Sequence, residues 1–144
     1  KYAVAVGGGY NHRLDLSSVI MIKDNHIVAA GGIVPALEQV KRNNPQGLFV
    51  ELEVDTLEQL QLALDTGGMD AFLLDNMSPE QVKTAIDMIR QHPQGGMGLF
   101  VEASGGMRAE TLPQYVNTGV NGISIGALTT QAQNVDIKLD FIEE

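Results

Sequence analysis

Basic side chains are concentrated in one short stretch of an acidic chain. The sequence has 9 Lys and Arg residues against 18 Asp and Glu residues, and its formal net charge is −9 at pH 7. This balance argues against a surface that binds nucleic acid or anionic membranes through phosphate contacts. His12, Arg13, Lys23 and His26 nevertheless all lie between positions 12 and 26. A small anionic ligand would need a local cluster of cations, and this stretch supplies one.

Two glutamates interrupt the apolar run at residues 48–54. Side chains of a strand alternate in direction, so Val50, Leu52 and Val54 face one side, and Glu51 and Glu53 face the other. A buried carboxylate costs several kcal/mol unless a cation, a metal or hydrogen bonds compensate it. We therefore expect a basic or metallic partner to face both glutamates.

Further polar residues follow other apolar runs. Asp75 and Asn76 end one run, Glu102 ends another, and Ser104-Gly105-Gly106 comes directly after it. Ligands of parallel α/β folds bind at the carboxyl ends of the strands, so these side chains are candidates for one site. Glycines before a helix let backbone N–H groups close on an anion, which makes Ser104-Gly105-Gly106 a candidate phosphate cradle at a predicted helix N-terminus.

The elements that position these residues alternate along the chain. Five short apolar runs bounded by turn residues predict strands, and most are followed by a stretch of helical period. Strands that alternate with helices in this way indicate βα units and a parallel sheet. The predicted strands are residues 19–22, 48–54, 71–74, 99–103 and 122–125.

Capping signals predict the intervening helices. Ser78 precedes Pro79, Gln81 is placed to close a capping box, and His92-Pro93 marks the end of this helix. Tyr2–Val6 fits either a strand or the last turn of a helix. The other predicted helices are Ile33–Asn43, 57–65 and 109–117.

Length and composition limit the fold and the chemistry. A chain of 144 residues suits one domain, but a complete eight-stranded α/β barrel typically needs about 250 residues. The absence of cysteine excludes disulfides, cysteine-ligated metals and thiol nucleophiles. No apolar run reaches the roughly 18 residues of a membrane span. We expect a cytoplasmic protein, or an organellar one if a transit peptide has been removed.

In their order along the chain, these motifs resemble the catalytic domain of the quinolinate phosphoribosyltransferase family. The GGG-x-x-HR and KDNHI pieces are the specific ones. The resembling stretches are KYAV (1–4), GGGYNHR (7–13), IKDNHI (22–27), ELEV (51–54), LDN (74–76), EASGG (102–106) and TGVNGISIGALT (118–129).

The resemblance implies a step of NAD biosynthesis, in which quinolinate and phosphoribosyl pyrophosphate give nicotinate mononucleotide, carbon dioxide and pyrophosphate. It implies Mg²⁺ as cofactor, with Glu53 and Asp75 as direct or indirect ligands. Lys23, Glu53 and Asp75 are the implied catalytic residues. The implied substrate-binding residues are His12, Arg13, Lys23, Glu53, Asp75, Ser104, Gly105, Gly106, Gly126 and Ala127.

The resemblance also implies an architecture. Residues 1–144 would form one partial catalytic domain, with about five βα units of an incomplete TIM-like barrel. The first barrel strand, a Thr-Arg-Lys-Thr stretch and a separate N-terminal domain of the family are missing from this sequence. Members of the family form homodimers, or larger homo-oligomers, in which a partner's N-terminal domain lends an arginine to the site. If residue 1 is a true terminus, this chain should therefore bind substrate weakly or not turn over.

Other readings of the same residues remain. Lys23 at a strand end beside carboxylates also fits a Schiff-base aldolase of the α/β-barrel type. An ion pair between Lys23 and Glu53 could be purely structural, and the chain could be a non-catalytic barrel fragment. A molybdenum-associated relative of the same family is a closer rival, although the intact Lys-Asp-Asn-His sequence at 23–26 favours the quinolinate enzyme.

Overall fold

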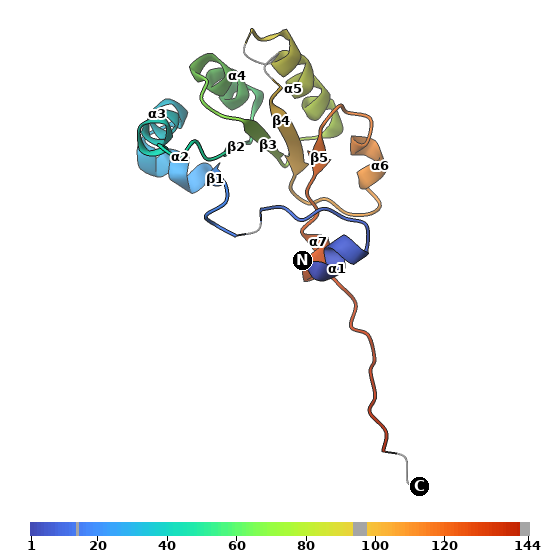
Figure 1. The fold of residues 1–144 in the computed structure, drawn as a ribbon. Helices are drawn as coiled ribbons and strands as arrows, with labels where there is room; N and C mark the ends of the chain where they lie inside the picture. Colours follow the sequence, from blue (N-terminus) through green and yellow to red (C-terminus); the bar gives the residue numbers. More distant parts are fainter. Residues whose placement is uncertain (14, 94–97, 142–144) are drawn as a thin grey trace.

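Five parallel strands form the centre of the computed structural model, which describes residues 1–13, 15–93 and 98–141 (Figure 1). The strands are hydrogen-bonded to one another in chain order. Each predicted strand is present with its ends shifted by at most two residues, and the prediction of an α/β fold with a parallel sheet is confirmed. The strands are β1 (Ile20–Ile22), β2 (Val50–Val54), β3 (Ala71–Asp75), β4 (Phe100–Ser104) and β5 (Gly122–Ile123).

Helices α3, α4 and α5 differ from α1 and α7 in their position relative to this sheet. In Figure 1, α3, α4 and α5 cover one face of the sheet, and α1 and α7 lie beyond the carboxyl ends of the strands. The helices are α1 (Tyr2–Val6), α2 (Asp24–Ala30), α3 (Ile33–Asn43), α4 (Leu57–Thr66), α5 (Pro79–Gln91), α6 (Leu112–Tyr115) and α7 (Ala127–Thr130).

The alternation of side chains along β2 separates the core from the site. Val50, Leu52 and Val54 are buried in one hydrophobic core with residues of the covering helices, such as Leu60 of α4 and Ile86 of α5. Glu51 and Glu53 therefore point to the opposite face, as predicted. We call this opposite face the inner face of the sheet.

Local signals explain the boundaries of α4 and α5. The Ser78 hydroxyl accepts a hydrogen bond from the Gln81 N–H, and the Gln81 side chain accepts one from the Ser78 N–H at 2.9 Å. The capping box predicted for α5 is thus present, and the helix ends at Gln91, immediately before His92. Thr56 caps α4 in the same manner by accepting from the N–H of Gln59.

Two helices differ from the prediction. The helix expected at 109–117 is only Leu112–Tyr115, because Pro113 is tolerated only in the first turn and Arg108 and Thr111 form a turn before it. Helix α2 was not predicted. Its first turn consists of Asp24, Asn25 and His26, which are poor helix formers. The ambiguous Tyr2–Val6 segment is helical.

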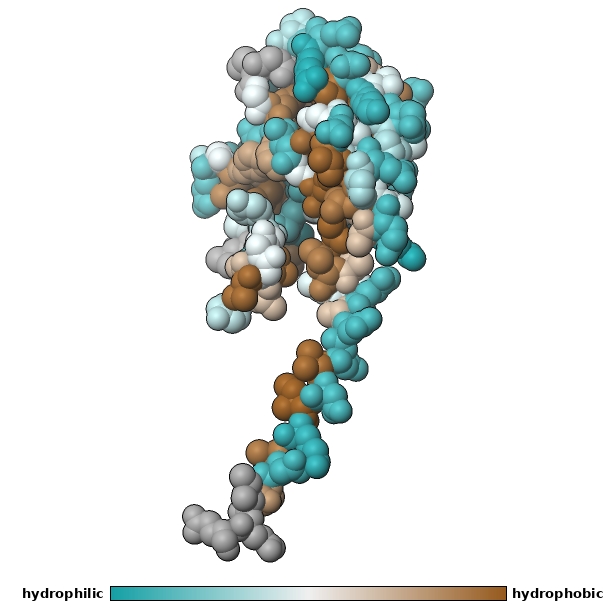
Figure 2. Space-filling model, turned by 90° about the vertical axis from the view of Figure 1, so that its right-hand side faces the viewer, coloured by the Kyte–Doolittle hydropathy of each residue, from teal (hydrophilic) through white to brown (hydrophobic). Residues whose placement is uncertain are grey.

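Residues 131–141, which follow α7, extend away from the sheet (Figure 1). Along this tail the apolar side chains Val135, Ile137, Leu139 and Phe141 are highly exposed and alternate with polar ones, as the alternating colours in Figure 2 show. Within the described part of the chain, no helix has both the length and the apolar character needed to span a membrane.

Candidate active site

The stretch between α1 and β1 crosses the carboxyl ends of the strands (Figure 1). It carries His12 and Arg13, and it ends where β1 begins. The predicted site residues come from this stretch and from the ends of all five strands. A parallel sheet gathers such residues at one edge because all its strands end on the same side.

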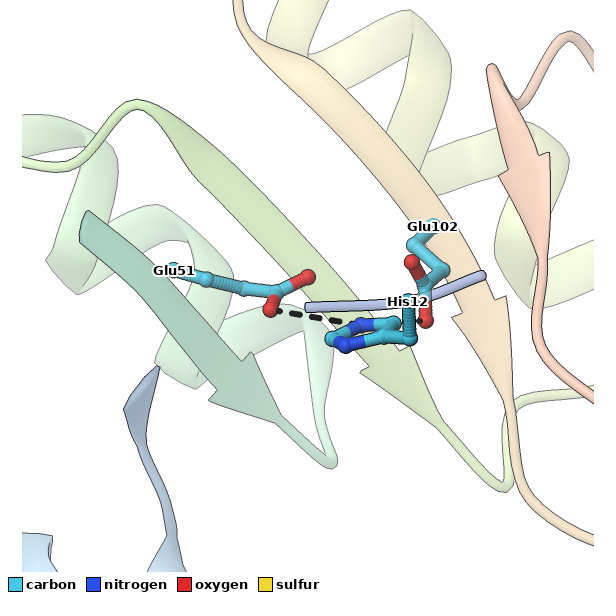
Figure 3. A group of neighbouring side chains, drawn as sticks. All are labelled: His12, Glu51 and Glu102. Carbon is cyan, nitrogen blue, oxygen red and sulfur yellow. Dashed lines mark ion pairs between the residues drawn. The ribbon is translucent and has the colours of Figure 1, made fainter. Parts of the chain in front are cut away.

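His12 lies between two buried carboxylates on strands that are not neighbours (Figure 3). Its Nε2 atom is 3.6 Å from a Glu51 oxygen on β2 and 3.4 Å from a Glu102 oxygen on β4. Only 4% of Glu51 and 7% of Glu102 is exposed. The Ser124 hydroxyl, just after β5, donates a further hydrogen bond to Glu102. His12 is therefore the partner that the burial of Glu51 requires.

Burial raises the pKa of Glu51 above the ordinary glutamate value. The neighbouring charge of Glu102 raises this pKa further, whereas His12, Arg13 and Lys23 act in the opposite direction. Two carboxylates close together in a poorly hydrated place disfavour each other's ionisation. The cluster thus combines an excess of negative charge with a single imidazole between the two carboxylates.

Lys23 provides the second predicted partner. Its Nζ atom is 3.3 Å from a Glu53 oxygen. Lys23 immediately follows β1, and Glu53 lies on the neighbouring strand β2, so the parallel pairing of these strands brings the two side chains together. The expectation that basic side chains face both glutamates of β2 is confirmed, with His12 at Glu51 and Lys23 at Glu53.

Three carboxylates form a second group at the sheet edge. Glu53, Asp55 and Asp75 each place an oxygen within 4.8 Å of the other two. Burial raises the pKa of Asp55, and the charges of Asp75 and Asp24 raise it further. Oxygen donors of this kind suit Mg²⁺, which is usually held by one or two carboxylates together with water or substrate oxygens. The residues present therefore fit the expected metal, and Asp55 joins the two ligands predicted from sequence.

Arg13 lines an open pocket together with Lys23 and residues of β1, the first strand in the order of the sheet. The pocket has a volume of about 570 Å³. Its cationic or imidazole lining comes from Arg13, Lys23 and His26, and its apolar lining includes Leu16 and Met21. An aromatic anion could fill such a space, because the rim offers positive charge and the walls offer apolar surface.

Asn76 and Gly105 lie in close contact where β3 and β4 end. The Asn76 N–H donates to the Ser104 carbonyl at 3.0 Å, and the Asn76 amide donates to the Asp75 carboxylate. Gly105 has φ +86°, and a Cβ atom there would lie 2.3 Å from the Asn76 side-chain oxygen. A larger residue at position 105 would displace Asn76, so Gly105 is needed for packing as well as for backbone freedom.

One sequence interpretation needs correction. No helix begins directly after Ser104-Gly105-Gly106, because residues 108–111 form a turn and α6 starts at Leu112. The expected phosphate cradle at a helix N-terminus is therefore wrong in that respect. His26, which belongs to the basic stretch between positions 12 and 26, accepts a hydrogen bond at Nδ1 from the Lys23 N–H at 3.0 Å.

The remaining predicted residues lie near this edge. Gly126 and Ala127 begin the short helix α7, which follows β5, the neighbour of β4. The sequence interpretation missed the bridge from Glu51 through His12 to Glu102, and it missed Asp55. The acidic position 55, two residues after Glu53, was the available signal for the latter.

Fold and site together define a class of protein. A parallel α/β sheet with cations and carboxylates gathered at the strand ends is the arrangement in which such folds bind small molecules. The family model "Quinolinate phosphoribosyl transferase, C-terminal domain" matches residues 1–140. The chain belongs to this family.

Relatives support the assignment across the whole chain. A probable nicotinate-nucleotide pyrophosphorylase (carboxylating) of Bacillus subtilis (strain 168) is 41% identical over 140 residues, which are 97% of this chain and 46% of that protein. The nicotinate-nucleotide pyrophosphorylase (carboxylating) of Homo sapiens is 39% identical over 140 residues, 96% of this chain and 46% of that protein.

Solved structures agree with the fold. A crystal structure of nicotinate-nucleotide pyrophosphorylase from Ehrlichia chaffeensis matches with a TM-score of 0.84 at 36% identity, covering 97% of this chain and 48% of that one. NadC from Streptococcus pyogenes matches with a TM-score of 0.81 at 39% identity, covering 94% of this chain and 45% of that one. The chain thus spans about half the length of the proteins it matches.

The buried pair of carboxylates predicts a pH dependence of stability. The folded-state pKa of Glu51 is raised, so the folded protein binds this proton more tightly than the unfolded one, and the contribution of Glu51 to stability falls as the pH rises above 4.5. Glu51→Gln removes this titration. Urea denaturation at several pH values measures the free energy of unfolding. That of Glu51→Gln, relative to that of the unchanged protein, should increase as the pH rises above 4.5.

Glu58→Gln is the matched control. Hydrogen bonds from its own N–H and from Thr56 lower the pKa of the exposed Glu58, so its contribution is present above pH 4.5 and is lost on acidification. The free energy of unfolding of Glu58→Gln, relative to that of the unchanged protein, should therefore decrease as the pH rises. Parallel curves for the two variants would contradict the assignment for Glu51.

Proposed function

We propose that the chain carries the active site of a carboxylating phosphoribosyltransferase that makes nicotinate mononucleotide for NAD biosynthesis. The ring nitrogen of quinolinate forms a bond to the anomeric carbon of phosphoribosyl pyrophosphate, and pyrophosphate leaves with the electron pair of the broken bond. The 2-carboxylate then leaves as carbon dioxide, and its ring carbon keeps the electron pair and takes up a proton. Family membership and the names of the relatives support this reaction.

The observation that carries the proposal is the basic pocket of a strongly acidic chain. Arg13 and Lys23 line the same open space, beside the apolar Leu16 and Met21. Quinolinate is a planar dicarboxylate, so charge-assisted hydrogen bonds from a guanidinium and an ammonium would hold it while the ring contacts apolar walls. His12, held between Glu51 and Glu102, adds a third basic group next to Arg13.

The carboxylates beside this pocket suit the transfer step. Displacement at the anomeric carbon develops positive charge on the ribose ring, and fixed carboxylates stabilise such charge. Glu53 and Asp75 are the candidates, since they lie within 4.8 Å of each other next to the lysine of the pocket. Lys23 keeps Glu53 in place by their ion pair, and Asn76 holds the Asp75 carboxylate.

Mg²⁺ is the proposed cofactor, held by Glu53 and Asp75 with Asp55 beside them. When bound, it supplies positive charge to the pyrophosphate that leaves. The phosphate of the phosphoribosyl group is assigned to the loops after β4 and β5. These neighbouring loops contain Ser104, Gly105, Gly106, Gly126 and Ala127.

The proposal extends to the architecture. We assign residues 1–144 to one partial catalytic domain whose parallel sheet is a portion of a TIM-like barrel, and we expect a homo-oligomer in which a second copy contributes to the site. Sequential order of the five parallel strands supports the barrel, because barrel strands pair in chain order. The cytoplasm remains the proposed location on sequence grounds alone.

The aldolase reading is less compatible with the site. A Schiff base forms from a lysine with a free electron pair, whereas the Lys23 ammonium is 3.3 Å from the carboxylate of Glu53. The relatives also carry the name of the transferase and not of an aldolase.

Loss of either pocket cation should weaken quinolinate binding. Arg13→Ala and Lys23→Ala are each expected to raise the KM for quinolinate about 10- to 100-fold, since a hydrogen bond to a charged group is worth roughly 1.5 to 3 kcal/mol. Steady-state kinetics of the naturally occurring protein would measure this. Arg42→Ala is the control, because Arg42 pairs with Glu38 on the exposed side of α3. An unchanged KM in both pocket variants would refute the assigned pocket.

Loss of Asp75 should act on the chemical step. Asp75→Ala is expected to lower kcat by roughly 100-fold, as for other groups that stabilise transition-state charge, with a smaller change in the KM for quinolinate. Asp87→Ala, on the exposed side of α5, is the matched control. A raised KM for quinolinate with normal kcat would contradict the role given to Asp75.

A further inference from the structure

The side chain of His26 has a fixed orientation at the start of α2. Lys23 is the N-cap of this helix, and the Lys23 N–H donates to Nδ1 of His26 at 3.0 Å. Gln81 makes the equivalent contact in α5, where its side-chain oxygen accepts from the N–H of Ser78. The contact in α2 thus replaces the usual Glu or Gln of a capping box by an imidazole.

An imidazole in this position has a defined tautomer. Because Nδ1 accepts a hydrogen bond, it carries no proton, and the proton of the neutral ring lies on Nε2. Protonation of Nδ1 would set two N–H groups against each other. His26 therefore presents Nε2–H as its ring donor.

This donor is available at the pocket. His26 lines the open space together with Arg13 and Lys23, and the ring is exposed. Within residues 1–13, 15–93 and 98–141, the hydrogen bond from Lys23 is the contact made by its ring nitrogens. The use of Nδ1 as a cap acceptor leaves Nε2–H for a ligand.

We propose that His26 binds the anionic substrate of this pocket by donating its Nε2–H to a carboxylate oxygen. The inference deepens the proposed function and rests on it, because quinolinate is the dicarboxylate expected here. Lys23 is already paired with Glu53, and His12 lies between Glu51 and Glu102, so carboxylates of the protein partly compensate both of these basic groups. The Nε2–H of His26 supplies a further hydrogen bond beside Arg13 and Lys23.

The test separates the cap from the ligand contact. In His26→Asn the amide oxygen can take the place of Nδ1, so the cap persists while the Nε2–H donor is lost; His26→Ala loses both. Gln81→Ala removes the equivalent cap in α5, away from the pocket. Kinetics and thermal denaturation would be measured for the naturally occurring protein and these three variants, with each substrate varied in turn.

His26→Asn is expected to raise the KM for quinolinate roughly 10- to 100-fold, with an unchanged KM for phosphoribosyl pyrophosphate and an unchanged denaturation midpoint. Gln81→Ala should lower the midpoint and leave both KM values unchanged. A rise confined to the KM for phosphoribosyl pyrophosphate would overturn the assignment to a carboxylate. Normal KM values in His26→Asn would overturn the inference and leave the proposed function intact.

A second measurement does not depend on turnover. Long-range ¹H–¹⁵N correlation spectra of the substrate-free protein should show His26 protonated at Nε2 and bare at Nδ1. The opposite tautomer would overturn the inference by itself. If the unchanged protein does not convert quinolinate, the proposed function fails, and calorimetry with quinolinate alone then decides the inference: loss of binding in His26→Asn supports it and equal binding overturns it.

Discussion

Two buried carboxylates on the inner face of the sheet constrain the arrangement of the site. Glu51 and Glu102 are almost fully removed from solvent, on strands β2 and β4, with β3 between them. Their burial would cost several kcal/mol each without a partner. His12 lies within ion-pair distance of both, so one imidazole is the partner of a carboxylate on each of the two strands. The stretch that precedes β1 must cross the sheet for this contact to form.

The contact has consequences for the neighbouring residues. Arg13 follows His12 directly, and it reaches the pocket at the edge of β1 that Lys23 and His26 also line. Lys23 then pairs with Glu53, which brings the basic pocket next to the group formed by Glu53, Asp55 and Asp75. A cationic site for a dicarboxylate and an oxygen-rich site for a metal and ribose thus share one edge of the sheet. This adjacency is what a transfer between two anionic substrates requires.

Sequence alone predicted the features that depend on local pattern. The alternation along β2 correctly separated Val50, Leu52 and Val54 from the two glutamates, and the capping box of Ser78 correctly located α5. The bridge through His12 could not be predicted, because it joins three segments far apart in the chain. The pairing of strands, not any local signal, sets that geometry.

Two helices were not predicted correctly from sequence. Helix α2 begins with an imidazole in place of the Glu or Gln of a capping box, so its start resembled a loop. The helix near 109–117 was predicted too long because Pro113 was not used as a marker of its first turn. For the site, the motifs identified the candidate residues along the chain, but the role of each residue is inferred from the chemistry of its side chain and its neighbours.

A double-mutant cycle between His12 and Glu102 tests the central claim most directly. Free energies of unfolding would be measured for His12→Ala, Glu102→Gln and the double variant. If His12 compensates the buried carboxylate, the two changes are coupled by about 1 to 3 kcal/mol, because Glu102→Gln removes most of the cost of losing the imidazole. Additive effects within about 0.5 kcal/mol would contradict the account.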